Sequence, residues 1–163
     1  MIEEREGWFV VNVARAHWHG HPQFGLRCSF EGEGRFPQVG VGLAVLEPGN
    51  PNCRYHRESA QEDFLVLSGT CLLIANGEER ELSAWDFVHC PPGTSHVFVG
   101  TGDGPCVLLM LGARFPGLEL FYPACELARR HGAEAPEPTA DPRVAYADVT
   151  RPQPCEAAPW PLA

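Results

Sequence analysis

Residues 48–69 read PGNPNCRYHRESAQEDFLVLSG, and the rest of the chain can be interpreted outward from this stretch. It holds three side chains able to bind a metal ion, His56, Glu58 and Glu62, and continues directly into an apolar run. Residues two apart on a strand point to the same face, so His56 and Glu58 can be directed at one point. A carboxylate at the mouth of an apolar strand is costly unless it is paired or coordinates a cation. The stretch therefore indicates a site at the start of a strand.

The flanking segments predict short strands separated by turns. Further apolar or β-branched runs are 39–46 (VGVGLAVL), 70–75 (TCLLIA), 85–90, 96–99 and 106–111. Asn76-Gly77 is a strong hairpin signal after 70–75, and Gly40 and Gly42 permit close backbone approach. Strands that recur every roughly 8–12 residues with turns between them are typical of an all-β sandwich or barrel.

The two ends of the chain differ from this central part. Trp8–Val13 predicts an outer strand, and residues 123–131 (PACELARRH) predict a short helix, with Pro near its start and Gly after its end. Residues 133–163 are rich in Pro, and we expect Tyr146, Trp160 and Leu162 to anchor this arm to the barrel or to a second subunit.

These features divide the chain into three parts. Residues 1–39 are expected to form N-terminal strands and a loop that flank the barrel, 40–112 the barrel core, and 113–163 a helix and an extended Pro-rich arm. The arm and the apolar outer strand both favour a partner surface, so we predict a homodimer.

Composition excludes several classes of function. The 163 residues include 44% hydrophobic and 20% charged residues, which suits one soluble domain. A net charge of −9 argues against nucleic acid as a partner. No apolar run approaches the roughly 20 residues that cross a bilayer, and the acidic start is unlike a secretory signal. The seven cysteines contain no C-x-x-C pair and are expected to be reduced thiols in a cytoplasmic protein.

Two motifs in this chain resemble those of the cupin superfamily, written G-x5-H-x-H-x3-4-E-x6-G and G-x5-P-x-G-x2-H-x3-N. His56, Glu62 and Gly69 follow the spacing of the first motif, and residues 91–96 (PPGTSH) match the centre of the second. The chain departs from the motifs at four positions. Gly49 lies one residue too far from the first His, Glu58 replaces the second His, Trp85 replaces the second motif's leading Gly, and Gly100 its closing Asn.

The resemblance implies a small single-domain cupin over about residues 40–112, with a double-stranded β-helix (jelly-roll) barrel around one divalent metal ion. Carried over residue by residue, the ligands are His56, Glu62 and His96, with Glu58 as a further candidate. Nitrogen and carboxylate ligands suit zinc, iron or manganese. Without Glu58, the remaining two histidines and one carboxylate form the set that non-haem iron oxygenases use.

Each candidate residue also has a more ordinary interpretation. The motif residues could be the surface charges of a decayed site, and Glu58 could pair with Arg54 or Arg57 instead of a metal. The alternating His17, His19 and His21 could bind a metal, although a run of this kind before Pro22 is more typical of an exposed loop.

Other side chains near the motifs have the same ambiguity. His89 could line the barrel as an acid or base, or be a hydrogen-bonded core residue. Cys53 and Cys90 are better explained as small buried hydrophobes than as reactive thiols. Tyr55 and Arg57 have the opposite strand parity to His56 and are placed outside the cavity. Residues with site parity would form an apolar wall or plain core: Phe64, Val66 and Phe98.

The favoured function is a metal-dependent enzyme acting on a small molecule, with an oxygenase-like reaction preferred over isomerase or lyase chemistry because of the two-His-one-carboxylate set. Fold alone cannot select a reaction. The alternative is a non-catalytic module that binds a metal and a small ligand. An open metal position with access to solvent would favour catalysis, and a closed shell of four protein ligands would favour a structural or sensing role.

Overall fold

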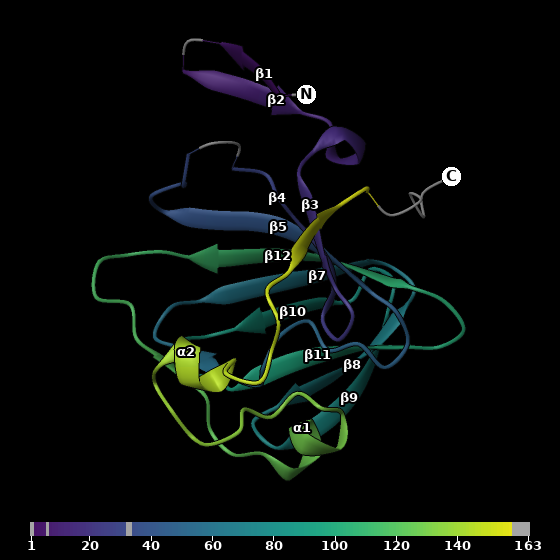
Figure 1. Cartoon of the computed structure of the whole chain (residues 1–163), viewed down its shortest axis with the longest axis vertical. Coiled ribbons are helices and arrows are strands. Elements are labelled where there is room, and N and C mark those ends of the chain that lie inside the picture. Colours follow the sequence, from purple (N-terminus) through teal and green to yellow (C-terminus); the bar gives the residue numbers. More distant parts are fainter. Residues whose placement is uncertain (1, 6, 32–33, 158–163) are drawn as a thin grey trace.

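The computed structural model describes residues 2–5, 7–31 and 34–157, and it consists mainly of antiparallel strands (Figure 1). The strands are β1 (Ile2–Arg5), β2 (Trp8–Val11), β3 (Trp18–His21), β4 (Gly25–Ser29), β5 (Val39–Leu46), β6 (Arg57–Glu58), β7 (Glu62–Ser68), β8 (Thr70–Ala75), β9 (Glu78–Ser83), β10 (Phe87–Cys90), β11 (His96–Thr101), β12 (Cys106–Ala113), β13 (Leu120–Phe121) and β14 (Gln153–Cys155). A 3₁₀ turn (Val13–Arg15) and the helices α1 (Glu126–Arg130) and α2 (Pro142–Ala145) complete the described elements. The all-β prediction is confirmed.

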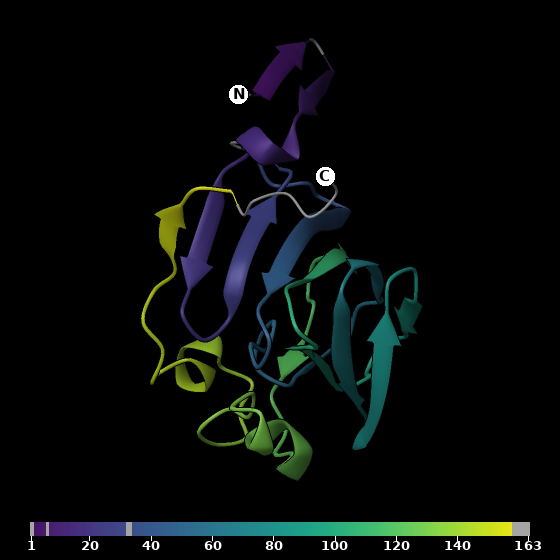
Figure 2. The same cartoon turned by 90° about the vertical axis from the view of Figure 1, so that its right-hand side faces the viewer.

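Two sheets enclose the main hydrophobic core. The larger has the strand order β10-β7-β12-β5-β4-β3-β14 and the smaller β11-β8-β9, while β1 and β2 form a separate hairpin that extends beyond one end (Figures 1 and 2). Side chains of both sheets meet between them: Leu46, Val66 and Leu108 from the larger, and Leu73, Leu82 and Phe98 from the smaller. Burying an aliphatic or aromatic side chain stabilises the fold by about 1.5–3 kcal/mol, so this layer holds the sheets together.

The predicted loop around the N-terminal histidines is instead strand β3. Trp18 is 2% exposed and packs in one cluster with Cys28 and Leu43, and the β3–β4 pairing runs from Trp18↔Cys28 to His21↔Gly25. The interpretation as a loop is wrong because the buried tryptophan fixes the segment in the sheet before Pro22 ends it.

Strand β5 is buried along only its second half. Leu43 to Leu46 are buried, whereas Val39 is 38% exposed. The close approach expected at Gly42 is present, since a Cβ there would lie 2.6 Å from the Cys28 carbonyl oxygen. This packing fixes β4 beside β5.

The described part of the C-terminal arm packs on the barrel. The buried Arg54 donates to the carbonyl oxygens of Gly132 (2.9 Å) and Glu134 (2.7 Å) and to the Asp148 carboxylate (2.7 Å). Its backbone N–H donates to the Tyr146 hydroxyl at 3.0 Å. Strand β14 then pairs with β3. A buried guanidinium thus fixes the arm through its hydrogen bonds.

Helix α1 begins three residues later than predicted and ends one residue earlier, and α2 was not predicted. α2 is a single turn whose Asp141 side chain accepts a hydrogen bond from the Arg143 N–H. Trp160 and Leu162, predicted as anchors, lie outside the described residues. In the part of the chain that the structure describes, no helix has the length and apolar character to span a membrane.

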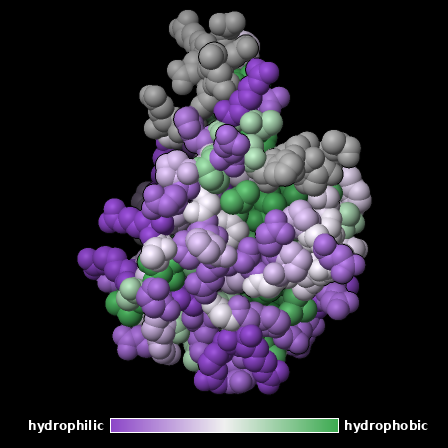
Figure 3. Space-filling model, turned by 45° about the vertical axis from the view of Figure 1, so that its right-hand side comes forward, coloured by the Kyte–Doolittle hydropathy of each residue, from purple (hydrophilic) through white to green (hydrophobic). Residues whose placement is uncertain are grey.

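Large apolar side chains are exposed at separate places on a mainly hydrophilic surface, one face of which is shown in Figure 3. Trp8 on β2 is 61% exposed, and Trp85 and Phe87 near β10 are 72% and 62% exposed. The apolar edge expected from Trp8–Val13 is therefore present, while the homodimer and the cytoplasmic location stay predictions.

Candidate metal centre

Backbone pairing brings the two motif histidines together. His56 and His96 form an isolated antiparallel bridge, with the His96 N–H donating to the His56 carbonyl (2.8 Å) and the His56 N–H donating to the His96 carbonyl (3.2 Å). Their ring centroids are 5.0 Å apart. Glu62 is the first residue of β7, and it pairs with Gly112 of β12 and Cys90 of β10. Two segments 40 residues apart thus meet beside a third strand.

The three side chains converge on one point. The Glu62 Oε2 atom lies 3.4 Å from His96 Nε2 and 3.7 Å from His56 Nε2. One ligand atom from each residue lies within 4.8 Å of the other two. His56, Glu62 and His96 therefore form a group that could hold a metal ion.

Both histidines have the tautomer that directs a lone pair into this group. His56 Nδ1 lies 2.9 Å from the Arg54 carbonyl oxygen, and His96 Nδ1 lies 3.0 Å from the Thr94 carbonyl oxygen. A carbonyl only accepts hydrogen bonds, so in the neutral imidazole each Nδ1 carries the proton and each Nε2 holds the lone pair. Histidines that bind metals are oriented by partners of this kind.

His96 Nε2 is the most informative atom of the group. It is buried and has no hydrogen-bond partner among the described residues. A buried polar atom without a partner is costly, and a cation at the convergence point would satisfy it. The chemistry of this donor set fits a divalent ion.

Burial also changes the acidity of two of the groups. It raises the pKa of Glu62 to about 7, an effect that His56 opposes and Glu58 increases. It lowers the pKa of His96 to about 4, with a smaller contribution from His56. At neutral pH His96 is therefore neutral and able to bind a metal, while Glu62 is partly protonated unless a cation stabilises its carboxylate.

Glu58 lies at the edge of the group. Its Oε1 atom is 3.9 Å from His56 Nε2, and it lines the same cavity, but it does not belong to the three residues that converge. Glu58 forms an ion pair with neither Arg54 nor Arg57, the two alternatives to a metal. Arg54 binds Asp148, and the Arg57 guanidinium lies 5.0 Å from the centre of the Phe121 ring.

A cavity of about 460 Å³ opens beside the three residues. Phe64 lines it, with its ring 5.1 Å from that of His96 and 4.5 Å from that of Phe98, so the expected apolar wall exists in part. Val66 belongs to the core instead. The remaining wall contains residues that the sequence did not indicate as site residues: Arg27, Asn52, Arg114, Tyr122 and Tyr146. Asn52 lies within the first motif, whereas the other four come from segments outside both motifs, and only the topology places them here.

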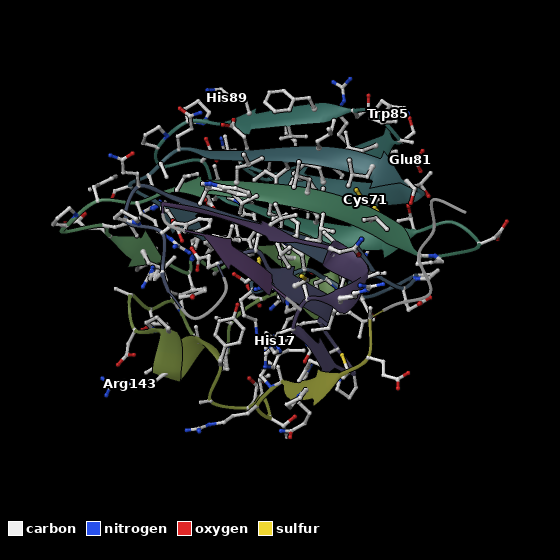
Figure 4. The ribbon with its side chains drawn as sticks, turned by 90° about the horizontal axis from the view of Figure 1, so that it is seen from above. His17, Cys71, Glu81, Trp85, His89 and Arg143 are labelled. Atoms are coloured by element: carbon white, nitrogen blue, oxygen red, sulfur yellow. The ribbon has the colours of Figure 1, made fainter. Side chains whose placement is uncertain are left out.

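The other histidines lie apart from this group. His89 is not buried as predicted: its side chain is 50% exposed and Nδ1 lies 2.6 Å from Asp63 Oδ1. His17 and His19 are exposed, and His21 Nε2 lies 3.1 Å from Thr150 Oγ1. Figure 4 labels His17 and His89 in different parts of the molecule.

The cysteines are free thiols, five of them buried. Cys53 lines the cavity, with Sγ 3.5 Å from His56 Nδ1, and burial raises its pKa to about 12, so it is a neutral thiol. Cys90 is buried in the barrel core. Tyr55, placed outside the cavity from its parity, is buried under the arm in a cluster with Cys53 and Ala133.

Residues 42–112 match the family model described as Cupin domain. No curated protein matches the chain. Among solved structures, a sugar phosphate isomerase of the cupin superfamily from Silicibacter pomeroyi DSS-3 is 24% identical, with a TM-score of 0.61 over 69% of this chain and 80% of that one. The polyketide cyclase RemF from Streptomyces resistomycificus is 16% identical, with a TM-score of 0.56 over 67% of this chain and 82% of that one.

A further structure, from Acidithiobacillus ferrooxidans ATCC 23270 and described as a candidate sugar phosphate isomerase, is 24% identical with a TM-score of 0.52. The match covers 59% of this chain and spans 64% of that one. At these identities the likeness concerns the fold alone.

Proposed function

The chain belongs to the cupin superfamily through its barrel, and on that premise we propose that it is a metal-dependent enzyme acting on a small molecule. His56, Glu62 and His96 would hold one divalent ion. The observation that carries the proposal is the buried, unpartnered His96 Nε2, directed at Glu62 and His56.

The donor set indicates which metals fit and what they would supply. Two imidazole nitrogens and one carboxylate suit zinc, iron or manganese and leave coordination positions open. A metal ion bound there would polarise an oxygen atom of the substrate and stabilise negative charge that develops on it. The protein residues orient the ligands through the Arg54 and Thr94 carbonyls and shape the apolar wall through Phe64.

The cavity favours catalysis over the alternative, a non-catalytic module that binds a metal and a small ligand. A cavity of about 460 Å³ next to a three-ligand group leaves room for a small molecule beside the ion. A storage or structural site would instead be closed by a fourth protein ligand.

Two reaction classes have support. The two-His-one-carboxylate set favours an oxygenase-like reaction, because non-haem iron oxygenases use it. The similar structure described as a sugar phosphate isomerase supports an isomerase as the second candidate. Oxygen consumption under the assay conditions separates the two, since an isomerase consumes none.

Elemental analysis of protein purified without added metal tests the proposal. We expect close to one zinc, iron or manganese ion per chain, and its reversible removal by a chelator. Protein that contains no such ion, and that takes up none of the three after chelator treatment, would contradict the proposal.

A further inference from the structure

Basic residues are concentrated in the cavity beside the candidate metal centre. The chain has a net charge of −9, and all twelve of its basic residues are arginines. Three of them, Arg27, Arg35 and Arg114, line this one cavity. Two carboxylates, Glu58 and Glu62, line the same cavity, so the arginines supply the positive charge that offsets them where a ligand would enter.

Arg27 contacts the segment that carries His56. It is on β4 opposite Ala44 of β5, whose side chain belongs to the inner core, so Arg27 is on the inner face of the large sheet. Its guanidinium donates to the Asn52 carbonyl. Its positive charge and a hydrogen bond also lower the pKa of the neighbouring Cys53, against the larger effect of burial. The Cys53 Sγ atom lies 3.5 Å from His56 Nδ1. The positive charge therefore lies beside one of the proposed ligands.

The three arginines differ in what they already bind. Arg114 forms an ion pair with Glu31 and donates to the Phe36 carbonyl (3.0 Å), so its charge is compensated and it holds the loop before β5. Arg27 has no acidic partner among the described residues. A guanidinium has five N–H donors, and the carbonyl of Asn52 uses only part of this capacity.

Two tyrosines extend the same wall. The Tyr122 ring lies 5.9 Å from that of His56 and 5.9 Å from that of Tyr146. Burial raises the pKa of Tyr122 to about 12, so its phenol is neutral and keeps its proton. Arg27 and the Tyr122 phenol thus present hydrogen-bond donors next to the metal-binding residues, which is the composition of an oxyanion site.

From this arrangement we infer that Arg27 binds an oxyanion group, a carboxylate or a phosphate, on a small substrate whose other end reaches the metal-binding residues. The inference rests on the proposed function for that second contact. Arg35, which is exposed on the loop before β5, adds positive charge at the rim. Arg27 is exposed to solvent, so an anion in the cavity can reach its guanidinium, whose planar fork suits a carboxylate or a phosphate.

Three probes with related carbon skeletons test this site: glycerate with a carboxylate, glycerol 3-phosphate with a phosphate, and glycerol with neither. We expect calorimetry to show millimolar or tighter binding of at least one anion and none of glycerol. Tighter binding of glycerate would assign a carboxylate substrate, and tighter binding of glycerol 3-phosphate a phosphorylated one.

Substitution of Arg27 identifies the residue responsible. Arg27→Gln should weaken anion binding about tenfold to a hundredfold, and Arg27→Lys, which keeps the charge but not the planar fork, should weaken it less. The matched control is Arg80→Gln on β9, an exposed arginine away from the cavity, which should bind as the wild type does. Urea unfolding of each variant checks that the barrel is intact.

Two results would overturn the inference: wild-type protein that binds neither anion or binds glycerol equally well, and an Arg27→Gln variant that binds the anions unchanged. Measuring binding in chelator-treated and Mn²⁺-loaded protein separates this inference from the proposed function. Anion binding that depends on Arg27 in a protein that takes up no metal would refute the proposed function alone. Metal uptake with anion binding independent of Arg27 would refute this inference alone.

Discussion

Adjacent carboxylates of β7, Glu62 and Asp63, each face a histidine, and the two pairs have opposite characters. Glu62 points inward, with its Oε2 atom 3.4 Å from His96 Nε2, and the His96 side chain is 1% exposed. Asp63 points outward and lies 2.6 Å from His89 Nδ1, and the His89 side chain is 50% exposed. The strand pleat alone separates the two pairs.

The two pairs differ in whether their hydrogen-bonding groups find partners within the pair. The Asp63–His89 pair forms a short hydrogen bond at the surface and needs no further group. On the inner side both Nδ1 protons are used by backbone carbonyls, so neither imidazole can donate to Glu62. When Glu62 is ionised, the neutral histidines and the carboxylate therefore present lone pairs to one another, an arrangement that a cation stabilises and that is otherwise unfavourable.

The largest expected effect comes from removing the two histidines of this comparison in turn. His96→Ala should weaken metal binding by at least about a thousandfold, because loss of a direct ligand costs more than the 10- to 100-fold that loss of an outer partner costs. His89→Ala should bind metal as the wild type does. Competition with a chelator of known affinity measures both, and a His96→Ala variant with unchanged affinity would remove His96 from the ligand set.

Aromatic side chains on the two faces give the next comparison. Phe64 is 3% exposed and packs against His96 and Phe98, whereas Phe87, two strand positions from His89, is 62% exposed. Phe64→Ala should lower the free energy of unfolding by about 3–5 kcal/mol, and Phe87→Ala by less than about 0.5 kcal/mol. Urea unfolding in the presence of a chelator measures both, and equal losses would show that the barrel interior is not packed as described.

The pH dependence of the metal-free protein provides a third contrast. Glu62 has a pKa near 7, raised by burial from 4.5, so its contribution to stability is present below about pH 4.5 and is lost as pH rises through 7. His96 has a pKa near 4, lowered by burial from 6.5, so its contribution is present above about pH 6.5 and is lost as pH falls through 4. The two contributions oppose each other between these values.

Glu62→Gln removes only the first of the two contributions. The stability of the metal-free wild type relative to this variant should fall between about pH 4.5 and pH 8, by at most about 3 kcal/mol. Asp63→Asn, which removes the neighbouring carboxylate, controls for the loss of one negative charge. A wild-type curve parallel to that of Glu62→Gln over this range would show that burial does not perturb Glu62.

The sequence was sufficient for the barrel and for the three converging residues, because both depend on local signals. Short segments of sequence encode the strand lengths and the turn residues such as Asn76-Gly77. They also encode the spacing of His56, Glu62 and His96. Metal ligation by these residues stays a prediction, as does that of Glu58.

What the sequence could not supply depends on strand register. His89 pairs with Asp63 and not with Glu62, and a shift of one residue would have turned it inward. The placement of Arg27 in the cavity depends on the β4–β5 pairing, and that of Tyr122 and Tyr146 on the path of the C-terminal arm. Contacts between distant segments carry no short sequence signal, so the position of these residues in the cavity could be found only in the structure.

The smallest expected effect concerns Glu58, which replaces the second histidine of the motif. Its carboxylate lies 3.9 Å from His56 Nε2 and outside the converging group, so Glu58→Gln should change metal affinity by less than about threefold. If Glu58 were a direct ligand, the same variant would lose affinity on the scale expected for His96→Ala, since an amide oxygen is a far weaker ligand than a carboxylate. Chelator competition on the two variants, measured side by side, therefore determines whether the inner group closes with four protein ligands or stays open to a substrate.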